Sequence, residues 1–126
     1  MKISTKTRYG MRVMLDLAER YDAGCTPLKD VADRQGLSKK YLEQVVAPLT
    51  AAGLLQGGYR LSRPPEQIAL ADVIAASEDG LDLMDCTSDL CACERADGCP
   101  SRLVWGGLQD AVNAYLESKT LADMTK

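Results

Sequence analysis

The residues best suited to chemistry are four cysteines within the segment CTSDLCACERADGC, residues 86–99. Clustered thiolates could hold an iron–sulfur cluster or a zinc ion. Neighbouring thiols could also form a disulfide on oxidation, or remain reduced without any ligand. Nearby carboxylates raise thiol pKa values and so disfavour reactive thiolates without a metal. The candidate metal ligands are Cys86, Cys91, Cys93 and Cys99, of which Cys91 fits least well because it stands only two residues before Cys93.

The composition of the chain bounds the kind of protein that carries these thiols. It has 126 residues, enough for one domain with an appended element, and it contains no histidine. We find no signal peptide and no apolar run long enough to cross a membrane, so we expect a cytoplasmic protein with no membrane partner. Disulfides are then improbable as permanent structural bonds. An enzyme is disfavoured, because the sequence lacks a histidine base, a C-x-x-C pair and a glycine-rich phosphate loop.

Charge is divided unevenly between the two halves of the chain. Residues 1–63 contain eleven Lys or Arg against six Asp or Glu, whereas residues 64–126 contain four against twelve. The balance is therefore +5 in the first half and −8 in the second. A basic half is typical of a domain that meets a polyanion such as nucleic acid.

The basic half predicts three helices. The first is expected from Ser4 or Thr5 to about Tyr21, with apolar residues at helical spacing. Thr26 and Pro27 are expected to cap and begin the second helix, which covers LKDVADRQ. A third helix, KKYLEQVVAPLTAA, follows the turn QGLS and contains a proline expected to bend it. Two helices joined by a tight glycine turn indicate a helix-turn-helix.

The third helix has the two faces of a recognition helix. Four apolar residues can pack inward: Leu42, Val45, Val46 and Leu49. The polar residues gather at the end that would enter a major groove, and we take as DNA-binding candidates Ser38, Lys39, Lys40, Tyr41, Glu43 and Gln44. Lysine and serine suit phosphate or base acceptors, glutamate suits a cytosine amino group, and glutamine suits an adenine edge. Lys6 and Arg8 on the first helix and Arg60 further along are candidate phosphate contacts.

The remainder predicts a wing, a short helix and a long helix. Residues 54–56 and 59–62 are expected to form a small β-hairpin around Gly57 and Gly58. The segment IALADVIAAS predicts a short helix, and residues 100–118 predict a long one with a broad apolar face. We expect part of that face to meet a second copy of the chain. The fold class is therefore mainly α, a winged helix-turn-helix with a cysteine-rich loop and a long C-terminal dimerisation helix.

These segments together resemble the IscR/NsrR/CymR family of bacterial winged-helix transcription regulators. The resemblance is carried by MKISTKTRYGMRVMLDLA, PLKDVADRQGLSKKYLEQ, GGYRL, the cysteine segment and KTLADM near the end of the chain. It implies a homodimer whose C-terminal helices cross at the interface. The family's DNA-reading positions correspond here to Ser38, Lys40, Tyr41, Glu43 and Gln44. The resemblance also implies that cysteines between the two parts can hold an iron–sulfur cluster.

Two departures from the family pattern stand out. The family usually has a longer wing tip with an arginine, whereas Gln56 is followed at once by Gly57 here. Cys93 and Cys99 have the family's spacing, with Cys86 one residue further away than usual. The two familiar fourth ligands, a histidine or an aspartate, are replaced, and the residues at those positions are Arg102 and Arg8.

The sequence therefore predicts a DNA-binding homodimer whose affinity for its double-stranded DNA operator changes with the state of the cysteine segment. The expected organisation is a winged helix-turn-helix domain at 1–80, a cysteine-rich sensor loop at 81–99, and a dimerisation helix and tail at 100–126. The ligand expected in the sensor loop is an iron–sulfur cluster. Zinc, a metal-free regulator that uses thiol oxidation, and one that uses a regulatory protein partner remain alternatives. A protein–protein adaptor that uses the winged helix without DNA is the rival function.

Overall fold

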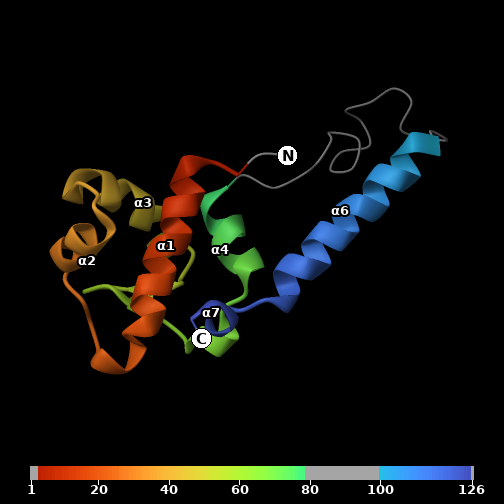
Figure 1. Cartoon of the computed structure of the whole chain (residues 1–126). Coiled ribbons are helices and arrows are strands. Elements are labelled where there is room, and N and C mark those ends of the chain that lie inside the picture. The colour runs from red at the N-terminus through yellow and green to blue at the C-terminus, as the bar shows by residue number, and fades with distance from the viewer. Residues whose placement is uncertain (1–2, 79–99, 126) are drawn as a thin grey trace.

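The computed structural model describes residues 3–78 and 100–125 of the chain (Figure 1). Cys86, Cys91, Cys93 and Cys99 lie outside the described residues, and so does the whole of the expected sensor loop, residues 81–99. The described part is mainly helical, with one two-stranded antiparallel sheet. No helix in it is both long and apolar enough to cross a membrane.

Helix α1, Thr5–Glu19, forms the centre of the N-terminal body. Its N-terminus is capped by Ser4, whose Oγ accepts a hydrogen bond from the backbone N–H of Thr7 at 3.2 Å. The helix ends two residues earlier than expected, and a 3₁₀ turn, η1 (Tyr21–Ala23), follows it. Its buried stripe includes Val13, Met14 and Leu17, as the helical spacing predicts.

The helix-turn-helix consists of α2 (Leu28–Gln35) and α3 (Lys39–Ala51). Gly36 ends α2 in the left-handed region at φ 67°, which glycine adopts without steric cost. Ser38 then caps α3 by accepting the backbone N–H of Tyr41 at 3.1 Å. Helix α3 continues through Pro48. Its four expected apolar residues, Leu42, Val45, Val46 and Leu49, are all buried.

The start of α2 differs from expectation, because Pro27 occupies the N-cap position and Thr26 stands before it. The backbone N–H of Thr26 instead donates to the carbonyl of Tyr59 at 3.0 Å. This bond connects the segment before α2 to the wing. A local helix-start pattern does not predict such a contact.

The wing is a short hairpin of β1 (Leu55–Gln56) and β2 (Arg60–Leu61). Leu55 pairs with Leu61, and Gln56 with Arg60. The strands are shorter than expected, and the hairpin is closed by a hydrogen bond from the Tyr59 N–H to the Gln56 carbonyl at 3.0 Å. Every residue of this hairpin lies within the described part of the chain, so its short form is the form the sequence adopts.

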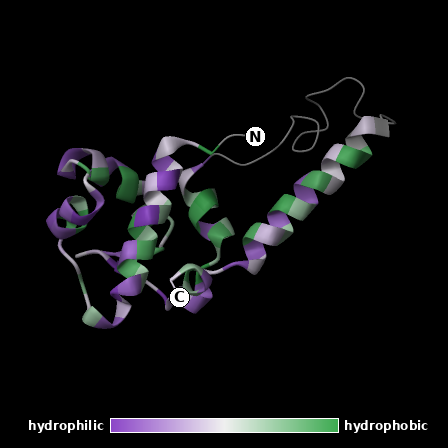
Figure 2. Ribbon diagram, in the orientation of Figure 1, coloured by the Kyte–Doolittle hydropathy of each residue, from purple (hydrophilic) through white to green (hydrophobic). Residues whose placement is uncertain are grey.

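A third layer, α4 (Leu70–Ser77), covers α1 and α3. Gly10 of α1 permits this approach, since a Cβ atom there would stand 3.4 Å from Ser77 Oγ and 3.7 Å from a methyl carbon of Leu49. Figure 2 shows the hydrophobic residues of α4 in green, beside those of α1. Val73 and Ile74 are the buried residues of this helix.

The end of the chain returns to the N-terminal body. Helix α6, Pro100–Ser118, projects away from the body and leads to α7, Leu121–Met124, a short helix that the sequence analysis did not anticipate (Figure 1). The backbone N–H of Leu121 donates to the Ile68 carbonyl at 3.0 Å, and that of Leu70 to the Lys119 carbonyl at 2.8 Å. The Leu121 side chain is fully buried in the same core as α1 and α3.

Candidate nucleic-acid interface

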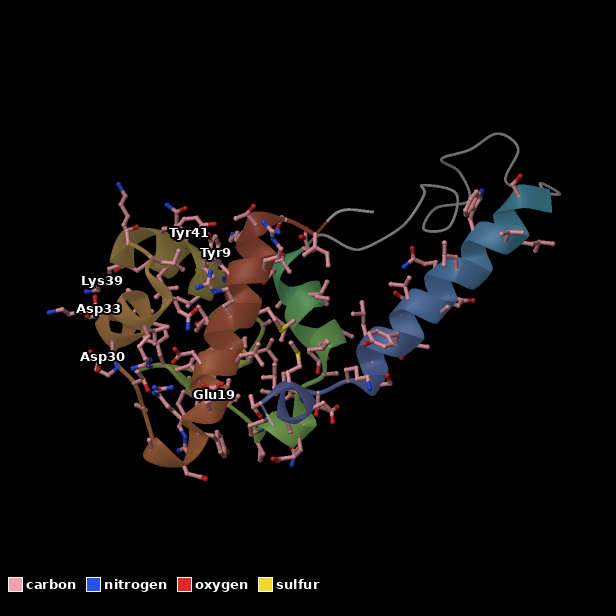
Figure 3. All side chains as sticks on the ribbon, viewed as in Figure 1. Tyr9, Glu19, Asp30, Asp33, Lys39 and Tyr41 are labelled. Carbon is pink, nitrogen blue, oxygen red and sulfur yellow. The ribbon has the colours of Figure 1, made fainter. Side chains whose placement is uncertain are left out.

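The N-terminal end of α3 presents the predicted reading residues to solvent. Five of them are exposed: Ser38, Lys39, Lys40, Glu43 and Gln44. No acidic residue lies in the first turn of α3, so the positive end of the helix dipole and the two lysines act together. In Figure 3, Lys39 lies on the same side as Asp30 and Asp33 of α2, which lower the positive potential around it.

Tyr41 joins the recognition helix to α1. It is half-buried, and its ring meets that of Tyr9 edge to face, with centroids 5.8 Å apart (Figure 3). Such pairs of aromatic rings contribute about 0.5–1.5 kcal/mol beyond their area of burial. Tyr41 therefore helps to fix the reading end of α3 against α1 as well as standing beside the exposed reading residues.

The first turns of α1 contribute cations to the same region. Lys6 and Arg8 are exposed, as expected for phosphate contacts. Arg8 makes one long hydrogen bond, from Nη2 to Thr5 Oγ1 at 3.5 Å. Together with Tyr9, Arg8 and Arg12 line an open hollow of about 320 Å³.

Arg12 was not among the residues singled out from the sequence. Its Nε donates to Gln35 Oε1 at 3.0 Å and its Nη2 donates to the Gln35 backbone carbonyl at 3.2 Å. Its guanidinium also lies over the Tyr9 ring, 5.1 Å from the centroid. The signal that could have found it is its spacing, since Arg12 follows Arg8 by four residues and so shares its helix face.

A buried carboxylate sets the position of α2 on α1. Asp16 accepts hydrogen bonds from Arg34 Nε and Nη2 at 3.0 and 2.6 Å, and from Gln35 Nε2 at 3.0 Å. Burial raises the pKa of Asp16, but the hydrogen bonds from Arg34 and Gln35 and the charges of Arg34 and Arg20 outweigh it and hold that pKa below its ordinary value. The same pair raises the pKa of Arg34, mainly through its hydrogen bond to Asp16. The turn that presents α3 is therefore fixed by charged hydrogen bonds.

Arg60 of the wing has a different environment from the other candidate phosphate contacts. It is half-buried, and its guanidinium lies 4.9 Å from the centroid of the Tyr21 ring. Its Nε is buried without a hydrogen-bond partner among the described residues. Its position therefore connects the wing to the end of α1, and only its outer edge remains open to a ligand.

The N-terminus of α1 is tied to the residue at which the described N-terminal part ends. The backbone N–H of Ser4 donates to Glu78 Oε1 at 2.7 Å. This bond, with hydrogen bonds from the Ser4 and Thr7 side chains, lowers the pKa of Glu78. Glu78 is the last described residue before position 79, and it lies beside the N-terminus of the helix that carries Lys6 and Arg8.

Within the described residues, no group of three or more potential ligand side chains could hold a metal ion. Cys25 is exposed and lies beside the wing, with its Sγ 3.9 Å from the Gly57 carbonyl. Cys25 belongs to the connection before α2 and is not part of the core.

Comparison with known proteins places this arrangement in a family. The sequence model of the Rrf2 family, described as "Iron-dependent Transcriptional regulator", matches residues 3–126. "Protein rrf2" of Nitratidesulfovibrio vulgaris is 36% identical over 132 aligned positions, which cover 100% of this chain and 88% of that protein.

Two solved relatives share the fold and much of the sequence. The HTH-type transcriptional regulator CymR of Bacillus subtilis is 38% identical over 98% of this chain and 89% of that protein. Its structure, described as that of "the Global Cysteine Regulator", superposes with a TM-score of 0.83 over 99% of this chain and 96% of that one. The structure of T. potens IscR is 37% identical, with a TM-score of 0.75 over 98% of this chain and 85% of that one. The comparisons confirm the predicted winged helix-turn-helix fold.

Proposed function

Because the chain belongs to the Rrf2 family of transcriptional regulators, we propose that it binds operator DNA as a homodimer whose affinity is set through the cysteines of residues 86–99. The family is one of DNA-binding regulators and not of enzymes. The observation that carries the proposal is the exposed polar end of α3, held rigidly on α1 and α2 and free of acidic residues in its first turn.

The contacts with DNA fall into two groups. Base edges would meet Glu43 and Gln44, which can accept from cytosine and bind adenine. Phosphates would meet the exposed cations of the first turns of α1 and α3, namely Lys6, Arg8, Lys39 and Lys40, with the Ser38 hydroxyl beside them. Tyr41 positions the helix. Arg60 would contribute less to phosphate binding, because Tyr21 covers one face of its guanidinium.

Dimer formation is supported by α6. It carries five large hydrophobic residues in solvent: Leu103, Val104, Trp105, Leu108 and Tyr115. Figure 2 shows hydrophobic bands along this projecting helix. An apolar stripe of that length is typical of a helix that packs on another helix. A dimer would present two α3 helices to successive half-sites on one face of a duplex.

Control of affinity through the cysteines is supported by the chemistry of the donor set. Four thiolates within fourteen residues suit an iron–sulfur cluster, and the description of the family as iron-dependent agrees with that ligand. Cys86, Cys93 and Cys99 are the first candidates, with Cys91 as the fourth. Such a cluster would supply redox or ligand sensitivity. The bond from Glu78 to α1 gives the segment a direct connection to the DNA-facing helix.

A metal-free mechanism is the second candidate. It is favoured by the likeness to CymR, whose structure superposes with a TM-score of 0.83, against 0.75 for T. potens IscR. Here the same cysteines would respond to oxidation, or a partner protein would bind the regulator. Zinc would make the loop structural instead of sensory, because zinc itself has no redox chemistry.

The test compares two states of one preparation. Anaerobically purified protein is analysed for iron, sulfide and zinc, and its binding to genomic DNA fragments is measured before and after removal of metal. A cluster-dependent regulator gives visible absorption bands, matching iron and sulfide, and an operator affinity that changes by about 5- to 150-fold. Equal affinity in both states would remove the sensor proposal but leave DNA binding. Failure to bind any duplex at low salt would favour the protein–protein adaptor.

A further inference from the structure

An open hollow lies beside the reading end of α3, on the surface of α1. Arg8, Tyr9 and Arg12 line it, and the contact of Tyr9 with Tyr41 places it next to the recognition helix. We propose that this hollow is a preformed binding site for one backbone phosphate of the bound duplex, and that Arg12 is the main residue that binds the phosphate. The inference rests on the proposed function, because a phosphodiester would reach the hollow only when α3 lies in the groove.

The charge of the hollow points to an anion. The salt bridges of the described residues involve only Arg20 and Arg34, both of which meet carboxylates. Arg8 and Arg12 have no such partner in this part of the chain, and α1 has no acidic residue in its first turn. Two guanidinium groups that face one opening repel each other, so an anion between them is stabilised by both.

Arg12 is held ready for that anion. Gln35 accepts from its Nε and one Nη2 N–H, and the Gln35 amide is itself fixed because it donates to buried Asp16. The Tyr9 ring supports the guanidinium on one face. These contacts leave the Nη1 donors without a partner among the described residues. A guanidinium that is already ordered loses less conformational entropy on binding than a free lysine would.

The geometry favours a phosphodiester over other anions. A planar guanidinium matches the paired oxygens of a phosphate, and the rows of phosphates that flank a major groove run beside any helix lying in it. Such a contact carries no sequence information. The hollow should therefore strengthen binding to operator and to unrelated DNA alike.

The experiment uses the full chain, a fluorescein-labelled duplex of mixed sequence and anisotropy titrations over a range of salt concentrations. Arg12→Gln should weaken binding by about tenfold for each lost contact. It should also reduce the slope of log K against log salt by about 0.9 for each Arg12, or about 1.8 for a dimer. Arg12→Lys keeps the charge and loses the fork, so it should weaken binding but retain most of the slope.

The matched control is Arg20→Gln. It removes the same charge at the C-terminal end of α1, where Arg20 is the C-cap residue. It should leave the slope at the wild-type value, and urea unfolding should show that each variant is folded. If the slope of log K against log salt is unchanged in folded Arg12→Gln, the proposal is wrong. Arg12 would then only help to hold α2 against α1. If the wild-type chain binds no duplex, it is the proposed function that has failed.

Discussion

Asp16 places a carboxylate inside the contact between α1 and α2, where its side chain is 3% exposed. It is the only charged residue that is buried in the described part of the chain. A buried charge is tolerated only when it is paired and hydrogen-bonded, and Arg34 and Gln35 together provide three short hydrogen bonds. The position of the helix-turn-helix on α1 therefore depends on one residue whose partners lie 18 and 19 positions away.

We expect Asp16→Asn to destabilise the fold by about 1–3 kcal/mol, because it removes the charge from a hydrogen-bonded buried pair while keeping the side chain's shape. Arg34 is 30% exposed at its side chain, so water can solvate the cation that is left and the loss stays in this range. Urea unfolding followed by circular dichroism at neutral pH measures the change. Asp22→Asn, at an exposed aspartate, is the matched control and should change stability little. A loss no larger than that of the control would show that the pair is energetically neutral.

The same variant has a predicted pH dependence. The folded pKa of Asp16 lies below its ordinary value of about 4, so the unfolded chain binds more protons in this range. The stabilisation is thus fully present above about pH 4 and is lost as pH falls through the folded pKa. The difference in unfolding free energy between wild type and Asp16→Asn should therefore shrink on acidification below about pH 4. A difference that grows on acidification would contradict this origin.

The turn of the wing contains two adjacent glycines with different backbone conformations. Gly58 has φ 82°, and a Cβ atom there would stand 3.4 Å from the Cβ and Sγ atoms of Cys25. Gly57 has ordinary φ and open space around it. Substituting each glycine in turn therefore tests how much the positive φ at position 58 contributes to stability.

Gly58→Ala should destabilise the protein by about 1–2 kcal/mol, since alanine is strained in the left-handed region. Gly57→Ala, the neighbouring control, should be neutral or stabilise the fold by up to about 1 kcal/mol, because it restricts the unfolded chain. Thermal and urea unfolding measure both. Equal effects of the two substitutions would mean that the turn relaxes to another conformation.

Much of the helix-turn-helix could be predicted because its signals are local. Ser4 and Ser38 cap the helices that they precede, Gly36 ends α2, and the apolar residues of α3 follow the helical period. Each of these features acts within one or two helical turns of its own residue. The exposure of most of the candidate DNA-binding residues of α3 followed from the same pattern.

What could not be predicted depends on contacts between distant segments. Thr26 does not cap α2, and its N–H donates to the carbonyl of Tyr59 in the wing, more than thirty positions away. The hydrogen bonds of Arg12 join it to Gln35, 23 positions away. Arg60 was predicted as a phosphate contact because no local pattern places the Tyr21 ring beside it. Sequence periodicity gives the face of a helix but not the partner of each side chain.

At the scale of the whole molecule, the C-terminal end is part of the N-terminal core. Leu121 is fully buried there, and the bridge between Ala69 and Thr120 fixes its approach. Helix α6 therefore has its C-terminal end anchored on the body that carries α3.

Leu121→Ala should cost about 2–5 kcal/mol, because it removes a fully buried side chain and leaves a cavity. Met124→Ala, three residues later, is the control, since Met124 is 45% exposed and should contribute little. Unfolding in urea at a fixed protein concentration measures both variants. A small effect at Leu121 would show that α7 adds no stability to the core.

An apolar stripe of α6 is exposed to solvent on the side away from the buried Gln109. Successive residues of a helix are turned by about 100°, so Val104, Leu108, Ala111 and Tyr115 fall on one side, whereas Gln109, which is buried, lies on another. In the proposed homodimer a second copy of α6 would cover this stripe, because both copies present the same apolar surface.

Leu108→Glu should therefore convert a dimer into a folded monomer of 13.6 kDa, because it places a charge in the apolar contact. Sedimentation velocity measures the mass, and circular dichroism checks that the helices remain. Ala114→Glu adds the same charge at an exposed position about 120° away around the helix and should leave the dimer intact. The monomer should also bind operator far more weakly, because it contacts one half-site where a dimer contacts two. A wild-type chain that sediments as a monomer, or a Leu108→Glu chain that remains dimeric, would show that the copies pair elsewhere or do not pair through α6.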